Sequence, residues 1–261
     1  MYPARPHVIV HYHIFKNAGT SVDAALRAAF GEAWEPFEGM HAHDIQPARE
    51  LAGFLRARPR LRAVSSHLAR PPLPFRRCHP IVFLRHPLLR AASVYRFCCR
   101  DPGQPQHGWA AGNSLRGFLD RCVAEASGLG RVVCDYQVFH LSSASAWAPV
   151  LPVVTGDHLG EASDLLREWG YVGVVERFDA ALAEYQRRYA PWFRGLRFPS
   201  AHENRSAGSI AGSDAGSLSA AVAAIGNELD PAVLERFREA NRHDYALYEW
   251  ASAWTMPAAV H

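Results

Sequence analysis

Lysine is almost absent from this 261-residue sequence. Lys16 is the single lysine among 28 lysine and arginine residues, and the formal net charge is +3 with histidine neutral. So small a net charge does not favour a nucleic-acid partner. Arginine supplies nearly all of the positive charge, and its planar guanidinium suits sulfate, phosphate and carboxylate groups. We interpret the densest arginine run, "RARPRLR" at 56–62, as a solvent-exposed face.

Cysteines are few, and long apolar segments are missing. The five cysteines are odd in number and never form a C-x-x-C pair, which favours buried thiols in a reducing compartment over a disulfide framework. A zinc site made of Cys78, His79, Cys98 and Cys99 lacks the usual ligand spacing. No apolar run approaches the ~20 residues of a transmembrane helix, and the N-terminus has no signal-peptide pattern. We therefore expect a cytoplasmic protein with no transmembrane segment.

Strand and helix patterns alternate along the chain. Strands are predicted at 7–14, 61–68, 80–85 and 170–178. Helices are predicted at 22–30, from Pro87 to about 99, at 114–125, at 134–141, from Phe178 to Tyr189, and from Pro231 to about 252. This alternation predicts one α/β domain over 1–261, with a central parallel sheet flanked by helices. The turn-rich segment 101–113 and the Gly/Ser-rich segment 206–221 are predicted to be loops, the second of them flexible.

The first candidate for chemistry is "HYHIFKNAGTS", in which a predicted strand runs through a glycine-bearing loop into a helix. This arrangement presents backbone N–H groups and the positive end of a helix dipole to an anion. Lys16 precedes Gly19, Thr20 and Ser21, whereas a triphosphate-binding loop, G-x-x-x-x-G-K-[ST], has its lysine after the glycines. Taken alone, the segment is equally well explained as an ordinary strand–helix connection.

The second candidate is "FLRHPLLRAASVYRF" at 83–97. Arg85 lies at the end of an apolar strand, where ligands of open α/β sheets bind. Ser93 lies about two turns into the helix that follows, so the two side chains are expected to hold one phosphate from two sides. The alternative is that Arg85 pairs with a carboxylate and Ser93 only packs.

Together the two segments resemble a known family. "HIFKNAGTS" resembles the 5′-phosphosulfate motif H-I-P-K-T-A/G-G-T-S of sulfotransferases that use 3′-phosphoadenosine 5′-phosphosulfate (PAPS), and "FLRHPLLRAASVY" resembles their 3′-phosphate motif R-[DH]-P-x-x-R-x-x-S-x-Y. Order and separation also match, and a looser likeness extends through 134–141, 171–182 and 202–206. The sequence looks closest to the carbohydrate-type branch with heparan 2-O- and chondroitin/dermatan-type enzymes and bacterial relatives. Phe15 and Asn17 depart from the usual proline and threonine.

The resemblance implies a P-loop-like sulfotransferase fold and an enzyme that moves a sulfuryl group from PAPS to a hydroxyl of a carbohydrate or glycoconjugate. No metal is required, because lysine and arginine supply the positive charge. Lys16 would contact the oxygen that bridges phosphorus and sulfur, where negative charge grows as the sulfuryl group leaves. The resemblance assigns the 5′ end of the nucleotide to Lys16, Asn17, Ala18, Gly19, Thr20 and Ser21, the 3′-phosphate to Arg85 and Ser93, and a closing loop to Arg205 and Ser206.

A histidine is the expected general base, because its pKa lies near neutrality. His67 follows a predicted strand in "VSSHLARPP" and matches in position the base of the resembling glycan enzymes, so we predict His67 for this role. His41 and His43 are the main alternatives for the base. They could also contact the acceptor or lie at the surface without a function. His13, the motif histidine, is expected to pack or to fix the loop.

Two other functions remain open from the sequence. The first is an ATP- or GTP-dependent phosphotransferase of P-loop type, although neither a Walker-type lysine nor an obvious magnesium-holding acidic strand end is present. The second is a non-catalytic nucleotide-binding module. Activity without magnesium separates sulfotransfer from the first, and transfer to any acceptor separates it from the second.

Overall fold

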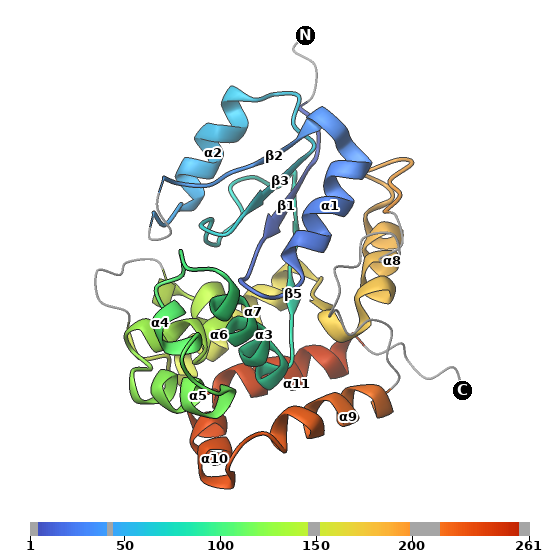
Figure 1. The fold of residues 1–261 in the computed structure, drawn as a ribbon. Coiled ribbons are helices and arrows are strands. Elements are labelled where there is room, and N and C mark those ends of the chain that lie inside the picture. Colours follow the sequence, from blue (N-terminus) through green and yellow to red (C-terminus); the bar gives the residue numbers. More distant parts are fainter. Residues whose placement is uncertain (1–4, 41–43, 146–151, 199–214, 256–261) are drawn as a thin grey trace. The chain divides into compact units, whose positions relative to one another are not determined.

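The computed structural model describes residues 5–40, 44–145, 152–198 and 215–255. The chain forms two compact units. The first contains residues 1–84, 164–212 and 257–261, and the second contains 85–163 and 213–256. We describe each unit by itself, with the element labels of Figure 1. The single domain expected over 1–261 stays a prediction.

A parallel sheet forms the centre of the first unit. Its strands are β1 (Val8–Tyr12), β2 (Trp34–Pro36), β3 (Ala63–Ser66) and β4 (Cys78–Ile81), in the order β2-β3-β1-β4. All three pairings are parallel. The predicted α/β class with a central parallel sheet is therefore confirmed. Because the carboxyl ends of parallel strands share one edge, the residues that follow β1 and β3 meet there.

The strand predicted at 80–85 is divided in the structure. β4 pairs with β1, whereas β5 (Phe83–Leu84) pairs in parallel with β6 (Gly173–Val174) in a separate two-stranded sheet. Val82 lies between the two strands and is fully buried, as is the whole run from Ile81 to Leu84. A continuous apolar run predicts burial but cannot show that the chain changes its partner strand halfway.

Helices α1 (Gly19–Phe30) and α8 (Phe178–Tyr189) pack against the sheet of the first unit. Their apolar residues share one core with sheet residues: Ile9, Val22, Leu26, Ala63, Ile81, Phe83, Phe178, Leu182, Tyr185 and Tyr189. The predicted stripe of α8 is thus confirmed. Gly31 is the C-cap residue of α1, and its φ of 53° lies in the left-handed region that glycine favours. Short 3-10 turns lie at Gly31–Ala33 and Val175–Arg177.

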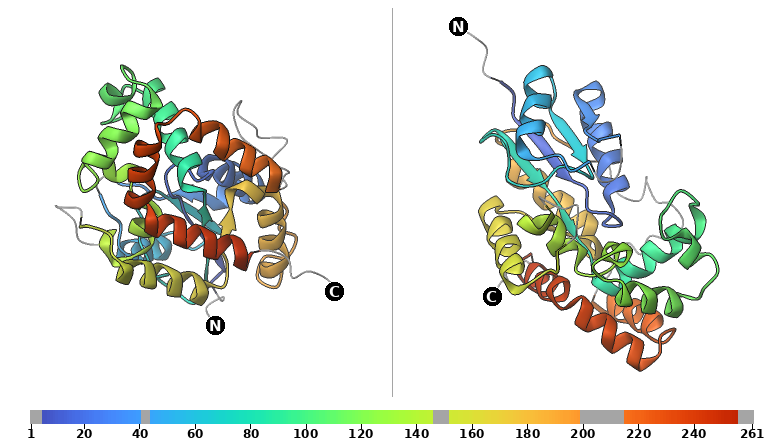
Figure 2. Two further views of the ribbon diagram at one scale, coloured as in Figure 1. Left: turned by 90° about the horizontal axis from the view of Figure 1, so that it is seen from below. Right: turned by 90° about the vertical axis from the view of Figure 1, so that its left-hand side faces the viewer.

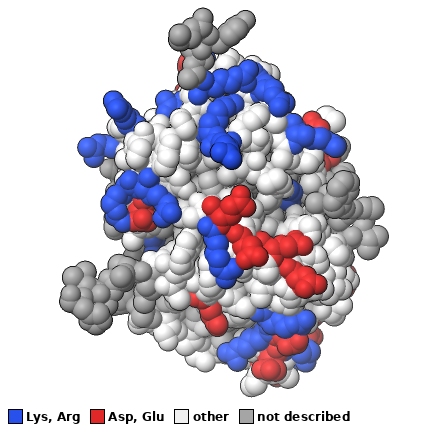
Figure 3. Space-filling view, turned by 180° about the vertical axis from the view of Figure 1, so that it is seen from behind, with Lys and Arg blue, Asp and Glu red and all other residues white. Residues whose placement is uncertain are grey.

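Helix α2 (Ala48–Ala57) is a first-unit element that the sequence analysis missed. It lies across the strands from α1 in Figure 1 and buries Leu51, Ala52 and Leu55. The run 56–62 that follows is mostly exposed, as predicted. There Arg58 pairs with Glu35 at 2.8 Å and stacks 3.9 Å from the Phe54 ring centroid. On the face drawn in Figure 3, basic side chains likewise stand in separate groups rather than as one continuous basic surface.

The second unit is helical in its described residues. Its helices are α3 (Pro87–Arg100), α4 (His107–Ala110), α5 (Leu115–Ala124), α6 (Tyr136–Leu141), α9 (Ala215–Gly226), α10 (Pro231–Ala240) and α11 (Arg242–Trp254), with 3-10 turns at Leu129–Val132 and Ser143–Ser145. α7 (Gly156–Trp169) crosses from the second unit to the first. Figure 2 shows α10 and α11 following one another along the chain. Among the helices of the described ranges, none is long and apolar enough to cross a membrane.

Three sequence predictions are corrected in the second unit. The helix predicted from Pro231 to about 252 is divided into two helices, because the chain turns at Asn241 between α10 and α11. The predicted loop 101–113 contains the single turn α4. Of the predicted loop 206–221, residues up to 214 lie outside the described residues, while 215–221 begin α9. Alanine accounts for α9, because it has the highest helix propensity and five alanines lie between 215 and 224.

Candidate functional site

The loop between β1 and α1 has an unusual backbone. Lys16 and Ala18 have φ values of 66° and 60°, in the left-handed region that non-glycine residues seldom adopt. Each such residue costs of order 1–3 kcal/mol, and such strain gathers at functional sites. Residues of alternating hand turn successive N–H groups toward one side and make a concavity that binds anions. The backbone thus supports the anion loop predicted from the sequence.

Asn17 anchors this loop to the sheet region. Its side chain is buried, and Nδ2 donates a hydrogen bond of 2.8 Å to the carbonyl of Phe83 in β5. Its backbone N–H donates to the Ile14 carbonyl at 3.1 Å and closes the turn. Two of the donor groups of Asn17 are therefore engaged within the protein. The residue helps to fix the shape of the loop, and the nucleotide contact predicted for it from the sequence stays a prediction.

Gly19 is required by a close contact rather than by its own backbone angle. A Cβ atom placed on Gly19 would lie 1.8 Å from Nε2 of His13. The imidazole thus rests directly against the first residue of α1, where no side chain fits. This supports the expectation that His13 packs and fixes the loop. Pattern alone does not reveal that the glycine makes room for the histidine six residues before it.

The N-terminus of α1 has no side-chain cap. Ala18 is the N-cap residue, and its carbonyl accepts hydrogen bonds from the N–H groups of Ser21 and Val22 at 2.9 and 3.2 Å. The N–H groups of the first helical residues have no intrahelical acceptor and lie at the positive end of the helix dipole. Thr20 is exposed and Ser21 half-buried, so both hydroxyls are accessible. This helix start suits a phosphate or sulfate.

Three histidine rings stack beside the loop, on the shared edge of β1 and β3. The ring centroids of His11 and His13 lie 5.0 Å apart, and those of His13 and His67 lie 3.6 Å apart. The side chain of His67 is 44% exposed, whereas His13 is buried. Burial lowers the pKa of His13 to about 4, against the opposing effect of Asp23, so its ring is uncharged at neutral pH. His67 is thus the accessible imidazole of the stack.

Glu38 holds His67 in place. Its Oε1 lies 3.0 Å from Nδ1 of the His67 ring, and its two oxygens accept the His67 backbone N–H at 2.9 and 3.2 Å. A carboxylate on Nδ1 fixes the tautomer that leaves Nε2 unprotonated and able to accept a proton. Sequence analysis missed Glu38, because the two residues are 29 positions apart and no motif joins them.

Asp23 of α1 lies between the two buried histidines of the stack. Its Oδ1 is 2.8 Å from Nδ1 of His11, and its Oδ2 is 3.2 Å from Nδ1 of His13. Burial alone raises the pKa of Asp23, but its close contacts with the two histidine rings and their charges outweigh the burial and hold the pKa well below its ordinary value. Asp23 is therefore ionised at neutral pH. No motif in the sequence distinguishes Asp23 from the other carboxylates.

Arg85 is the first residue of the second candidate segment that belongs to the second unit. Its backbone N–H donates to Oε1 of Gln137 at 2.8 Å, and its carbonyl accepts from Nε2 of Gln137 at 3.0 Å. One side-chain amide thus satisfies both backbone polar groups of Arg85 and fixes the backbone two residues before α3. Ser93 lies half-buried in the second turn of that helix. The spacing predicted from the sequence, strand end to two turns along the helix, is the one observed.

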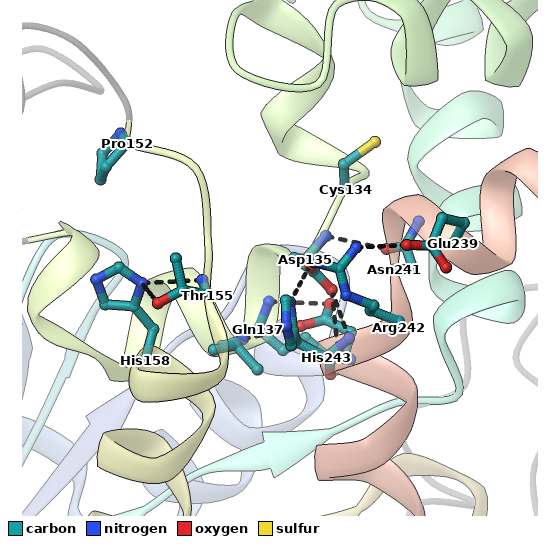
Figure 4. Close-up of polar contacts among 12 residues, drawn as sticks. Cys134, Asp135, Gln137, Pro152, Thr155, His158, Glu239, Asn241, Arg242 and His243 are labelled. Atoms are coloured by element: carbon teal, nitrogen blue, oxygen red, sulfur yellow. Dashed lines mark hydrogen bonds and ion pairs between the residues drawn. The ribbon is translucent and has the colours of Figure 1, made fainter.

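Gln137 is itself fixed by carboxylates that cap two helices reciprocally. Asp244 of α11 accepts the N–H groups of Gln137 and Val138 at the start of α6, at 3.1 and 2.8 Å. Asp135, just before α6, accepts the N–H groups of His243 and Asp244 at the start of α11. Figure 4 shows Asp135 directed at this start, with Gln137 alongside. Burial, then the charge of Asp135, raises the pKa of Asp244 to about 6.

The second arginine of the α3 segment, Arg90, is a structural residue. Its side chain is fully buried and stacks 4.9 Å from the Tyr136 ring centroid, and Nη2 donates to the carbonyl of Val132 at 2.6 Å. Burial lowers the pKa of Arg90, although the charge of Asp244 acts against this. Arg90 joins α3 to the segment before α6. It differs in this from Arg85, which is only half-buried.

Four of the predicted site residues or their rivals cannot be located. Arg205 and Ser206 lie outside the described residues, as do His41 and His43. Among the others, Lys16, Ala18, Gly19, Thr20 and Ser21 share one loop and helix start in the first unit, with His67 stacked on the neighbouring His13. Arg85 and Ser93 share α3 and its entry in the second unit.

Comparison with known proteins identifies one family. A family model described as the sulfotransferase family matches residues 2–251, which contain both candidate segments. An uncharacterized protein from Archaeoglobus fulgidus is 26% identical over 202 residues, covering 72% of this chain and 76% of that protein. The family match covers nearly the whole of both units, so it is not confined to one motif.

Proposed function

Because the chain belongs to the sulfotransferase family, we propose that it transfers a sulfuryl group from PAPS to a hydroxyl of a carbohydrate or glycoconjugate. The observation that carries the proposal is the loop 16–21. It combines the only lysine of the chain, two left-handed residues and a helix start without a side-chain cap. The five cysteines are all free thiols, which supports a reducing, cytoplasmic compartment.

The loop and the start of α1 fit the 5′-phosphosulfate. The N–H groups around Gly19 and the hydroxyls of Thr20 and Ser21 offer donors to the anion oxygens. The absence of a Cβ at Gly19 lets His13 support the loop from behind. Lys16 supplies a full positive charge, which would stabilise the bridging oxygen as the bond to sulfur breaks. A single fixed donor aimed at developing charge commonly contributes ~3–4 kcal/mol to catalysis.

Arg85 and Ser93 form the proposed 3′-phosphate site. A guanidinium binds a phosphate through two parallel N–H donors, and a serine hydroxyl adds a third. Gln137 holds the Arg85 peptide through two hydrogen bonds and so limits the positions open to the side chain. Arg205 and Ser206 are proposed as further contacts to this phosphate on the strength of the sequence motif alone. The 3′-phosphate is the group that distinguishes PAPS from ATP.

His67 is the proposed general base. As the acceptor oxygen attacks sulfur, Nε2 of His67 would take the hydroxyl proton, and adenosine 3′,5′-bisphosphate would leave on the opposite side. Glu38 on Nδ1 stabilises the imidazolium that results. The half-exposed position of His67 supports access by a large acceptor. Glu38 is a positioning residue in this scheme, because it acts through His67.

Variants of Lys16 and Arg85 test the division of roles. The measurement is transfer of labelled sulfate from PAPS to a panel of carbohydrate acceptors without magnesium, together with the affinity for adenosine 3′,5′-bisphosphate. Lys16→Ala is expected to lower turnover by about two to three powers of ten with a small change in affinity. Arg85→Ala is expected chiefly to weaken nucleotide binding. Arg58→Ala, which removes an exposed arginine paired with Glu35, serves as the control.

Equal losses of affinity in Lys16→Ala and Arg85→Ala, with turnover otherwise unchanged, would contradict these roles. Transfer that occurs only from ATP or GTP with magnesium would replace sulfotransfer by phosphotransfer. Tight binding of the bisphosphate without transfer to any acceptor of a broad panel would favour a nucleotide-binding module.

A further inference from the structure

Three metal-binding side chains converge beneath the anion loop. His11 lies on β1 and His13 directly follows the strand, and their rings stack with centroids 5.0 Å apart. Asp23 reaches the same point from α1. One donor atom from each of the three residues lies within 4.8 Å of the others, the only such group of three among the described residues. Convergence of donors from two elements is the first requirement of a metal site.

The donors are buried, and one of them is poorly satisfied. The side chains of His11 and His13 are 2% and 8% exposed, and that of Asp23 is 24% exposed. Nδ1 of His13 is 3.2 Å from Oδ2 of Asp23, yet within the described structure it makes no hydrogen bond of proper direction. A buried ring nitrogen normally has a well-aligned hydrogen-bond partner or a metal ion bound to it. A metal ion between the three groups would provide one.

The donor separations, each to a different oxygen of Asp23, are equal to or shorter than those around a coordinated ion. Zinc binds imidazole nitrogen at about 2.0–2.1 Å and carboxylate oxygen at about 2.0–2.2 Å, which places two tetrahedral ligand atoms about 3.3 Å apart. The observed separations from the Asp23 oxygens are 2.8 Å to His11 and 3.2 Å to His13. Ser65 adds an oxygen 3.2 Å from Nδ1 of His11. Small outward movements of these side chains would therefore suffice for an ion.

We propose that His11, His13 and Asp23 bind one divalent ion of the zinc class, through Nδ1 of each histidine and the carboxylate. Two imidazoles and one carboxylate suit zinc or cobalt and do not suit magnesium or calcium. The ion ties β1 to α1 directly behind the anion loop. It takes no part in sulfuryl transfer, whose charges are met by Lys16 and arginine. The site rests on these three residues and does not depend on the proposed function.

Cobalt binding tests the site directly. The full chain is freed of metal with a chelator and titrated with Co²⁺, with Zn²⁺ used in competition. We expect one equivalent to bind and to give the visible absorption of tetrahedral cobalt, without the sulfur-to-cobalt charge-transfer band that cysteine ligands produce. Asp23→Asn is expected to weaken binding at least tenfold. His79→Asn is the matched control, because His79 is a buried histidine of the same unit that contacts His7 instead.

A second measurement needs no variant and covers the case in which Asp23→Asn does not fold. Zinc is added to wild-type protein labelled with ¹⁵N in histidine, and the ring nitrogens are observed by NMR. Two histidines should show zinc bound at Nδ1. Absence of stoichiometric binding would overturn the site, and so would binding that Asp23→Asn leaves unchanged or zinc found on cysteine sulfur. Both readouts are independent of nucleotide binding and sulfate transfer, so failure of the metal site and failure of the proposed function are distinguishable.

Discussion

Gln137 and Arg85 are joined by two hydrogen bonds through which one side-chain amide pairs with the backbone N–H and the carbonyl of one residue. The bonds measure 2.8 and 3.0 Å, and the residues are 52 positions apart. Asp244 in turn holds the N–H of Gln137. A chain of buried contacts therefore runs from α11 through α6 to the residue proposed to bind the 3′-phosphate.

Gln137→Leu should loosen Arg85 and weaken recognition of the 3′-phosphate. Loss of both bonds removes the Gln137 partner of the Arg85 N–H and carbonyl and is expected to lower the free energy of unfolding by about 2–3 kcal/mol. Urea unfolding measures the loss of stability. In calorimetric titrations, the ratio of the affinities for adenosine 3′,5′-bisphosphate and adenosine 5′-monophosphate should decrease. Gln104→Ala, which removes only a contact with Asp101, is the control. If a folded Gln137→Leu protein kept the full preference for the bisphosphate, Gln137 would have no part in recognition of the 3′-phosphate.

Gly19→Ala should disrupt the anion loop through His13. The new methyl group would overlap the imidazole, and overpacking of this kind costs about 1–3 kcal/mol. Bisphosphate affinity should fall with stability, and His13→Ala in the same chain should restore part of both. Gly53→Ala is the matched control, because a Cβ at Gly53 meets nothing within 4 Å. If Gly19→Ala behaved like Gly53→Ala, the contact between ring and glycine would not be the reason for the glycine.

Glu38→Ala should lower turnover through His67. His67→Asn is expected to reduce turnover by about 10²–10⁴-fold, the range typical of a general base. Glu38→Ala should cause a smaller loss, and the double variant should be no slower than His67→Asn alone, because both changes remove one function. Nucleotide affinity should stay constant. Glu35→Ala removes a nearby glutamate that pairs with Arg58 and serves as the control. Multiplying losses in the double variant would show that Glu38 acts independently of His67.

Stability below neutral pH should depend on His86, the N-cap residue of α3. Burial, then the charges of Arg238 and Arg85, lowers the pKa of His86 from 6.5 to about 4. Between these values the unfolded chain binds a proton that the folded chain does not. The stability that the neutral ring contributes is therefore present above pH 6.5 and lost as pH falls toward 4, with a slope of at most about 1.4 kcal/mol per pH unit.

The comparison for this prediction is between wild type and His86→Asn in urea-unfolding experiments from pH 7.5 to 4.5. The ring of His86 packs edge-on to Tyr245 and Tyr248, so the variant is expected to be less stable at pH 7.5 as well. The difference between the two proteins should narrow as the pH falls. Asp244, whose pKa is raised to about 6, titrates in both proteins and therefore does not change the difference between their free energies of unfolding. A constant or widening difference would contradict the lowered pKa of His86.

Local sequence patterns predicted the strand–loop–helix unit of β1 and α1, the helix from Pro87 and the apolar stripe of α8, because each depends on neighbours along the chain. Patterns could not find Glu38, Asp23 or Gln137, which act on residues 29, 12 and 52 positions away. Long-range pairing also explains why the run 80–85 divides between β1 and β6. The sequence motif identifies the anion loop, and the structure identifies the side chains that hold this loop in place.

The most direct test of the nucleotide site is the thermal stability of the purified protein with adenosine 3′,5′-bisphosphate, and with ADP as control, in the absence of magnesium. A ligand at 100 times its dissociation constant stabilises by about 2.7 kcal/mol, which shifts the melting temperature measurably. A shift with the bisphosphate that ADP does not produce, and that Arg85→Ala abolishes, is the predicted result. A shift seen only with ADP and magnesium would contradict a 3′-phosphate site and the assignment of Lys16 to a phosphosulfate loop.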